Sequence, residues 1–220
     1  MKLHHHLDDA TLVSYSAGAL PAALAVVASA HLERCATCRD QLLDADRIGG
    51  VLVQQQRAEA PADDARAAML ALLDDAPVAE PFGLPTEIIE ERDPDRLPRA
   101  LHPWFGQSMR ALRWRRVAPG VQRILATDIH GGDLMLLRIA PGSKLPLHSH
   151  AGNELTMILD GAYDDMLGHF GPGDVADLDG DTLHQPVTSP GVPCICVAAT
   201  DGPLKFSGWL ARTLQPLFGF

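Results

Sequence analysis

The sequence has no long apolar run and few basic side chains. Its apolar stretches fall far short of the roughly twenty residues that a membrane-spanning helix needs, and the chain before Asp8 lacks the features of a secretory signal. We therefore expect a cytoplasmic protein that does not enter a membrane. Lys and Arg total 18 against 28 Asp and Glu, which gives a formal net charge of -10. This shortage of cations disfavours direct binding to nucleic acid, because that affinity depends on basic contacts to phosphate.

Cysteine is also scarce, and its placement is informative. Cys35 and Cys38 form a C-x-x-C motif, while Cys194 and Cys196 form a C-x-C motif near the other end. In a reducing compartment, close pairs of this kind indicate metal or redox chemistry before structural disulfides. The composition is otherwise that of a folded globular protein, with 46% hydrophobic and 21% charged residues over 220 positions.

Apolar spacing predicts that the N-terminal third of the chain is helical. Residues 8–75 repeat apolar side chains at intervals of three and four, which is typical of short amphipathic helices. In the third of these helices, at about residues 37–56, we expect Leu42, Leu43, Ile48 and Val51 to point inward.

After residue 75 the pattern changes twice. Prolines alternate with acidic residues between positions 76 and 100, which indicates a linker, because proline fixes the backbone and removes a hydrogen-bond donor. From residue 101 onward, short apolar runs are bounded by Gly, Pro and Asp, which predicts an antiparallel β-barrel or jelly roll. We therefore expect an α+β multidomain chain, with a small helical bundle at residues 1–75, a linker at residues 76–100 and a β-barrel at residues 101–220.

The first candidate metal site is the motif H-x-x-x-C-x-x-C, formed by His31, Cys35 and Cys38. If one helix runs through the motif, the three side chains share a face, and thiolates with imidazole suit the tetrahedral N/S coordination of Zn²⁺. A fourth ligand would close the shell and make the site structural. The candidates for it are the three histidines before the first helix, His4, His5 and His6. The alternatives are a redox pair, two buried small residues or solvated histidines, and the motif spacing favours zinc over them.

The second candidate metal site is a His and Glu motif flanked by glycines at residues 142–161. His148 and His150 alternate on a strand and leave the same face. Glu154 begins the next apolar strand, and His184 follows a Gly-Pro-Gly-Asp turn. Three imidazoles and one carboxylate inside a barrel predict a divalent metal site that keeps a position for water or ligand. These ligand types allow Fe, Mn, Ni, Co, Cu or Zn, and the flanking glycines disfavour the alternative of exposed turn residues.

The second cysteine pair has a simpler interpretation. Cys194 and Cys196 fall on one face of an apolar strand and are too far apart for a comfortable disulfide. We expect core residues, with oxidation of a thiol near the metal as the alternative.

Together these motifs resemble a known family. Residues 142–161 resemble the first motif of the cupin superfamily, and residues 168–184 resemble the second, except that Gln185 follows the histidine where cupins have Asn. The H-x-x-x-C-x-x-C motif is similar to that of zinc-containing anti-sigma factors. Both motifs in this order, with the C-x-C and A-A-T-D sequences that follow, resemble the ChrR-type anti-sigma factors over nearly the whole chain.

The resemblance implies a cytoplasmic bacterial regulator that is not an enzyme. Its helical zinc domain would hold an extracytoplasmic-function (group IV) sigma factor in a 1:1 complex, and its cupin domain would release that factor under singlet-oxygen or organic-peroxide stress. Leucines such as Leu12, Leu24 and Leu43 offer more apolar surface than so small a domain can bury, and we expect a partner to cover the excess. The implied zinc ligands are His6, His31, Cys35 and Cys38. The implied ligands of a second divalent metal, for which Zn, Mn, Fe and Ni are candidates, are His148, His150, Glu154 and His184.

Two other functions compete with this one. A cupin dioxygenase would use iron in the same four-residue cluster to activate O₂ and cleave a small molecule such as a diketone. A storage or isomerase cupin is the third interpretation. The N-terminal zinc motif favours the regulator, because a free-standing oxygenase has no chemical need for it.

Overall fold

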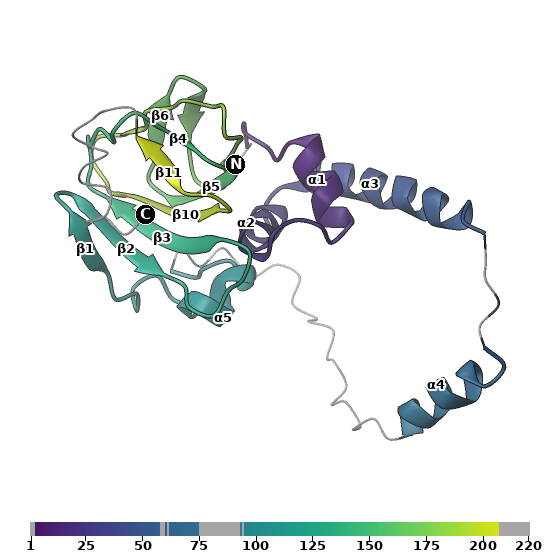
Figure 1. The fold of residues 1–220 in the computed structure, drawn as a ribbon. Coiled ribbons are helices and arrows are strands. Elements are labelled where there is room, and N and C mark those ends of the chain that lie inside the picture. The colour runs from purple at the N-terminus through teal and green to yellow at the C-terminus, as the bar shows by residue number, and fades with distance from the viewer. Residues whose placement is uncertain (1–2, 58–59, 61, 75–92, 94, 207–220) are drawn as a thin grey trace.

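The computed structural model describes residues 3–57, 60, 62–74, 93 and 95–206, which form a helical lobe followed by a β lobe (Figure 1). The expected linker at residues 76–100 lies mostly outside the described residues. The helices are α1 (Asp9–Ser16), α2 (Ala22–Leu32), α3 (Ala36–Gln54), α4 (Ala65–Asp74), the 3-10 helix η1 (Arg99–Leu101) and α5 (His102–Phe105). The strands are β1 (Arg115–Ala118), β2 (Val121–Leu125), β3 (Asp133–Ile139), β4 (His148–His150), β5 (Glu154–Asp160), β6 (Tyr163–Asp165), β7 (Gly168–Phe170), β8 (Val175–Leu178), β9 (Val187–Thr188), β10 (Cys194–Thr200) and β11 (Leu204–Phe206).

Antiparallel strands build the β lobe. The largest sheet has the order β1-β2-β3-β10-β5-β8, and the smaller sheets β11-β4 and β7-β6-β9 lie across from it (Figure 1). The central strand β10 is buried on both faces: Val197 contributes to the core that contains α2, whereas Cys196 faces the interior between the sheets. Helices followed by an antiparallel barrel confirm the predicted fold class.

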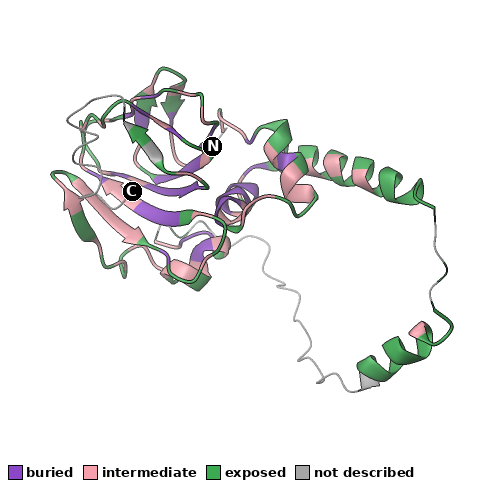
Figure 2. Ribbon diagram, viewed as in Figure 1, coloured by how far each residue is buried: buried purple, intermediate pink, exposed green. Residues whose placement is uncertain are grey.

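Helix α2 is buried on nearly all sides (Figure 2). Its alanines and short aliphatic side chains let it lie close to β5, β10 and η1. Leu24 and Val27 of this helix belong to the same apolar core as Leu101 and Leu155 of the β lobe. The two lobes therefore share one core.

A carboxylate at the end of α2 adds a polar contact between the lobes. Glu33 accepts hydrogen bonds from the backbone N–H groups of Arg99 at 2.9 Å and Ala100 at 2.8 Å. These groups open η1, where N–H donors have no partner within the helix itself. Glu33 thus caps the first helical turn of the β lobe.

Helix α3 exposes most of its apolar side chains (Figure 2). The inward orientation predicted for Leu43, Ile48 and Val51 is wrong, because these side chains are 53%, 62% and 52% exposed. Leu42 does pack against the core, as predicted. Helix α3 packs mainly against α1 and α2, and no element of the described chain covers its outer face. The predicted partner surface also changes: Leu12 and Leu24 are buried within the protein, whereas Leu43 is exposed. None of the described helices is both long and apolar enough to cross a membrane.

Candidate metal centres

Four side chains of the helical lobe converge on one point. The ligand atoms of His6, His31, Cys35 and Cys38 all lie within 4.8 Å of one another. His6 Nδ1 is 3.2 Å from Cys35 Sγ and 3.6 Å from Cys38 Sγ. His31 Nε2 is 3.3 Å from Cys38 Sγ. The structure therefore brings together the four residues that the family resemblance implies.

A break between two helices creates this geometry. The condition that one helix runs through His31, Cys35 and Cys38 is not met, because α2 ends at Leu32 and α3 begins at Ala36, close to the start expected at about residue 37. Cys35 is the N-cap residue of α3 and has an extended backbone. Its Sγ accepts a hydrogen bond from the N–H of Cys38 at 3.4 Å. The side chains of the motif converge because the end of α2 and the start of α3 face the same point.

The three neighbouring histidines occupy different environments. His6 is half-buried and reaches the cysteines, whereas His4 is exposed. The ring of His5 stacks on Phe170, with centroids 3.8 Å apart, and its Nε2 lies 3.0 Å from the carbonyl oxygen of His169. Of the alternatives that the sequence left open, His6 is the one whose ring lies in the cluster.

Burial sets the protonation states of two members of this cluster, His31 and Cys38. It lowers the pKa of His31 to about 4, so the ring is neutral at pH 7 and can offer a lone pair. It raises the pKa of Cys38 to about 12, so the thiol ionises at neutral pH only with a cation beside it. Two thiolates and two neutral imidazoles are a donor set that Zn²⁺ takes in closed structural sites. The residues therefore fit a structural zinc ion.

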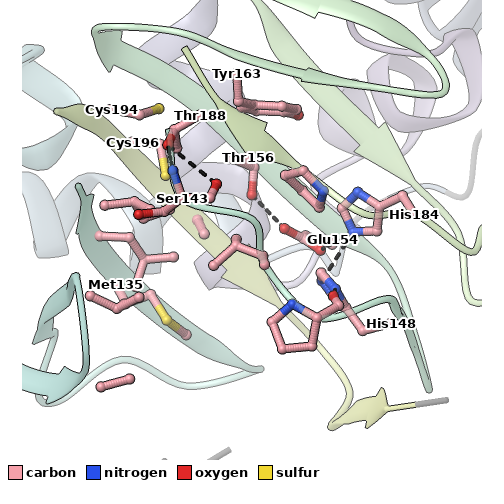
Figure 3. Close-up of a pocket in the computed structure, with 18 of the residues that line it drawn as sticks. Met135, Ser143, His148, Glu154, Thr156, Tyr163, His184, Thr188, Cys194 and Cys196 are labelled. Carbon is pink, nitrogen blue, oxygen red and sulfur yellow. Dashed lines mark hydrogen bonds and ion pairs between the residues drawn. The ribbon is translucent and has the colours of Figure 1, made fainter. Parts of the chain in front are cut away.

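A second cluster lies inside the β lobe. The ligand atoms of His148, His150, Glu154 and His184 all lie within 4.8 Å of one another. Strand β4 supplies the first two residues, β5 begins with Glu154, and reciprocal backbone hydrogen bonds of 3.1 and 2.9 Å join His184 to His148. His184 Nε2 is 3.1 Å from His148 Nε2 and 3.8 Å from Glu154 Oε2. Figure 3 shows the side chains of Glu154, His148 and His184 turned toward a common point.

The electrostatics of this cluster suit a cation. Burial opposes ionisation of Glu154, but contact with His150 and the charges of the other histidines outweigh it and lower the pKa of Glu154 to about 2. Oε2 of Glu154 and Nε2 of His150 lie against each other without hydrogen-bond geometry. Among the described residues, Nδ1 of His150 has no hydrogen-bond partner. Buried nitrogen and oxygen atoms that lie close together without hydrogen-bond partners fit a divalent metal held between the ligands.

A buried carboxylate behind His184 was not found from the sequence. Oδ2 of Asp165 lies 3.3 Å from Nδ1 of His184. In metal proteins such a partner fixes the tautomer and orientation of the ligating ring. Gln185, which replaces the Asn of the cupin motif, instead donates to the carbonyl of Leu145 at 3.0 Å. Asp165 therefore supplies a polar contact behind the ring, and no motif in the sequence marks it.

Two more contacts orient the remaining ligands. Nδ1 of His148 lies 2.9 Å from the carbonyl oxygen of Pro146, to which it can donate. The hydroxyl of Thr156 donates to the carboxylate of Glu154. These contacts leave the metal-facing atoms of both ligands directed into the cluster.

A cavity of about 270 Å³ opens beside the second cluster (Figure 3). Its walls are mainly apolar and include Met135 and Leu137 of β3. Cys194 and Cys196 are buried free thiols, as expected for core residues, and they also line the cavity. A small molecule in this space would meet both the metal cluster and the two thiols.

Comparison with known proteins agrees with this two-site architecture. Residues 105–204 match a family model described as a ChrR cupin-like domain. The chain is 38% identical over 221 residues to the anti-sigma-E factor ChrR of Cereibacter sphaeroides, with 99% of each chain covered. The chain belongs to the ChrR family of anti-sigma factors. A crystal structure of Rhodobacter sphaeroides SigE in complex with the anti-sigma ChrR matches this ChrR-family chain with a TM-score of 0.73 and 32% identity, covering 91% of this chain and 100% of that one.

Family membership decides between the functions that the sequence left in competition. The resemblance to ChrR-type proteins is confirmed, and with it the prediction that the chain is an anti-sigma factor and not an enzyme. Neither the dioxygenase nor the storage or isomerase alternative finds support in a ChrR-family chain.

Proposed function

We propose that this protein sequesters an extracytoplasmic-function (group IV) sigma factor in a 1:1 complex through residues 1–75 and releases it under oxidative stress through residues 101–220. The complex of ChrR with SigE supports the choice of partner, because that ChrR chain aligns with 91% of this one. Residues 76–100 would serve as the linker. The protein would act in the cytoplasm, where a sigma factor meets RNA polymerase.

The observation that carries this proposal is a set of exposed apolar side chains on each of the helices α3 and α4. These side chains are 48 to 72% exposed, and no described element covers them. We call the two exposed helix faces together the α3–α4 surface, and they consist of Leu43, Ile48, Val51, Leu52, Val53, Met69, Leu70 and Leu72. Exposed apolar helix faces of this kind are typical of protein-binding sites. A net charge of -10 would also speed association with a basic partner.

Charge substitutions on this surface test the proposal. In co-expression with the sigma factor, the double variant Ile48→Asp, Val51→Asp should no longer retain the factor on an affinity resin. The matched control is Met166→Asp, Val192→Asp, which places the same charges on exposed apolar positions of the β lobe and should retain the factor. Capture by the α3 variant at the parent level would contradict the proposed surface.

We also propose that the two clusters hold two separate metal ions in different roles. The cluster of His6, His31, Cys35 and Cys38 would hold a structural Zn²⁺ that ties the N-terminal segment to α2 and α3. The cluster in the β lobe would hold a divalent metal, with Zn, Mn, Fe and Ni as candidates, which supplies a Lewis-acid or redox centre facing the cavity. Elemental analysis tests this assignment. Cys35→Ser should lose the metal equivalent of the N-terminal cluster, and Glu154→Gln should lose the metal equivalent of the β-lobe cluster.

The β lobe would respond to oxidants because its cavity gives them access to reactive groups. A small oxidant in this space would meet the metal cluster and the thiols of Cys194 and Cys196. For the sigma factor to be released, the oxidised β lobe would have to lower the affinity of the helical lobe for the sigma factor. Such an effect is a coupling free energy between the two sites.

A further inference from the structure

A turn of the β lobe reaches into the N-terminal metal cluster. His31 is fully buried, and its Nδ1 lies 2.9 Å from the carbonyl oxygen of Gly173, between β7 and β8. A carbonyl can only accept a hydrogen bond, so Nδ1 carries the proton. Nε2, which faces Cys38, is then left with a free lone pair. A group 142 residues away in the sequence therefore sets the tautomer of a metal ligand.

The next residue of this turn fixes the chain segment that carries His6. Oδ1 of Asp174 accepts hydrogen bonds from the backbone N–H of His4 at 2.7 Å and of His5 at 3.1 Å. Its Oδ2 accepts from the N–H of Gly171 at 3.0 Å, which braces the turn itself. Residues 3–8 belong to no helix or strand. Contacts with the β lobe, and not secondary structure, therefore hold His6 in position.

A row of stacked rings continues this contact into the barrel. The ring of His5 lies on Phe170 with centroids 3.8 Å apart, and Phe170 lies on Tyr163 with centroids 4.8 Å apart. Both pairs are close to parallel, at 21° and 17°. Tyr163 lines the cavity that contains the second cluster. The neighbour of His6 is thus in packed contact, through two rings, with the wall of the other site.

We propose that Asp174 is a positioning residue for the N-terminal metal and that the 171–174 turn, with the rings of His5 and Phe170, makes the binding of this metal depend on the β lobe. Without these contacts, ordering residues 3–8 would cost conformational entropy each time His6 bound the metal. Polar groups behind metal ligands commonly change affinity about 10- to 100-fold when they are removed. If this dependence serves to release a sigma factor, that role rests on the proposed function. The effect of the β lobe on metal affinity does not rest on it.

Cobalt binding to the full-length protein tests the inference. Co²⁺ bound by thiolates gives a sulfur-to-metal absorption band, and Cys35 and Cys38 are the sulfur ligands among the eight proposed residues. The affinity is measured by competition with a chelator while the band is followed. Asp174→Asn changes the charge at nearly constant size, and we expect a 10- to 100-fold weaker affinity. The control is Asp164→Asn, an exposed carboxylate of β6 that pairs with His169, and it should keep the parent affinity.

A second matched pair keeps the inference testable if Asp174→Asn fails to fold. His5→Ala removes the stacking ring but keeps the backbone donor, and it should also weaken cobalt binding. His4→Ala removes an exposed ring from the same segment and should not. Parent affinity in a folded Asp174→Asn, or in His5→Ala, would overturn the inference. Because the assay contains no sigma factor, its outcome is independent of whether the β lobe controls sigma release.

Discussion

The hydroxyl of Thr156 donates a 2.5 Å hydrogen bond to Oε1 of Glu154, while Oε2 of the same carboxylate lies against His150. The bond holds the carboxylate in the orientation that points Oε2 into the cluster. Thr156→Val keeps the shape of the side chain and removes the donor. We expect the second metal to bind about tenfold more weakly, the lower end of the range for such contacts. Chelator competition measures this, and Thr182→Val, which alters an exposed contact with Asp179, should leave the affinity unchanged.

Removing the carboxylate itself should separate repression from release. Glu154→Ala takes away the one anionic ligand of the second cluster, so metal affinity should fall substantially. If sigma binding resides on the α3–α4 surface, the variant should still repress sigma-dependent transcription in unstressed cells. It should fail to release the factor when oxidant is added.

A reporter gene read with and without oxidant measures both effects. Asp160→Ala, at the exposed end of the same strand, should respond like the parent. Loss of repression in a folded Glu154→Ala would contradict the division of roles between the lobes, and turnover of a diketone by the purified protein would favour an enzyme.

The N-terminal metal should contribute directly to folding. Cys38 is fully buried between the two helices, and Cys38→Ala should lose one metal equivalent and part of the helical signal, because structural zinc supplies folding free energy. Far-UV circular dichroism with and without a chelator measures this. Cys194→Ala, a buried cysteine outside both proposed ligand sets, should keep the chelator-sensitive signal. Unchanged helicity after the metal is stripped from the parent would argue against a structural role.

Two leucines of the helical lobe should differ sharply in their effect on stability. Leu24 is 1% exposed in the core shared with the β lobe, and Leu24→Ala should lower the free energy of unfolding by about 2–5 kcal/mol. Leu43 is 53% exposed, and Leu43→Ala should change it by no more than about 0.5 kcal/mol. Urea unfolding followed by circular dichroism and by tryptophan fluorescence measures both. Equal effects of the two substitutions would show that α2 is not part of the shared core.

Local patterns in the sequence predicted the second cluster well. His148 and His150 share a side because side chains alternate along a strand. Glu154 follows four residues after His150, at the start of the next strand. The first cluster was predicted in its residues but not in its geometry. Helical spacing would bring His31 and Cys38 together only if one helix ran through both, whereas the structure uses the junction of two helices.

Contacts between distant segments could not be predicted from spacing. Asp165 carries no motif, and Asp174 is marked in the sequence only as the last residue of a Gly-Pro-Gly-Asp turn. The importance of both follows from which groups the fold places beside them. The orientation of Ile48 was wrong for a related reason. Helical periodicity shows that a face is apolar, but it does not distinguish a face covered by the same chain from one left for a partner.

The burial of α2 limits how freely these helices could be recombined with other sensory domains. Small residues such as Ala23, Ala28 and Ala30 have no exposed surface where α2 lies against the β lobe. A different domain joined after residue 74 would need a surface shaped to accept the same alanine-rich helix, together with an acceptor for the proton on His31. A chimera that kept residues 1–74 alone would therefore bring an unmatched surface with it, and engineers of hybrid regulators would have to transplant the 171–174 turn and the strands beneath α2 as well.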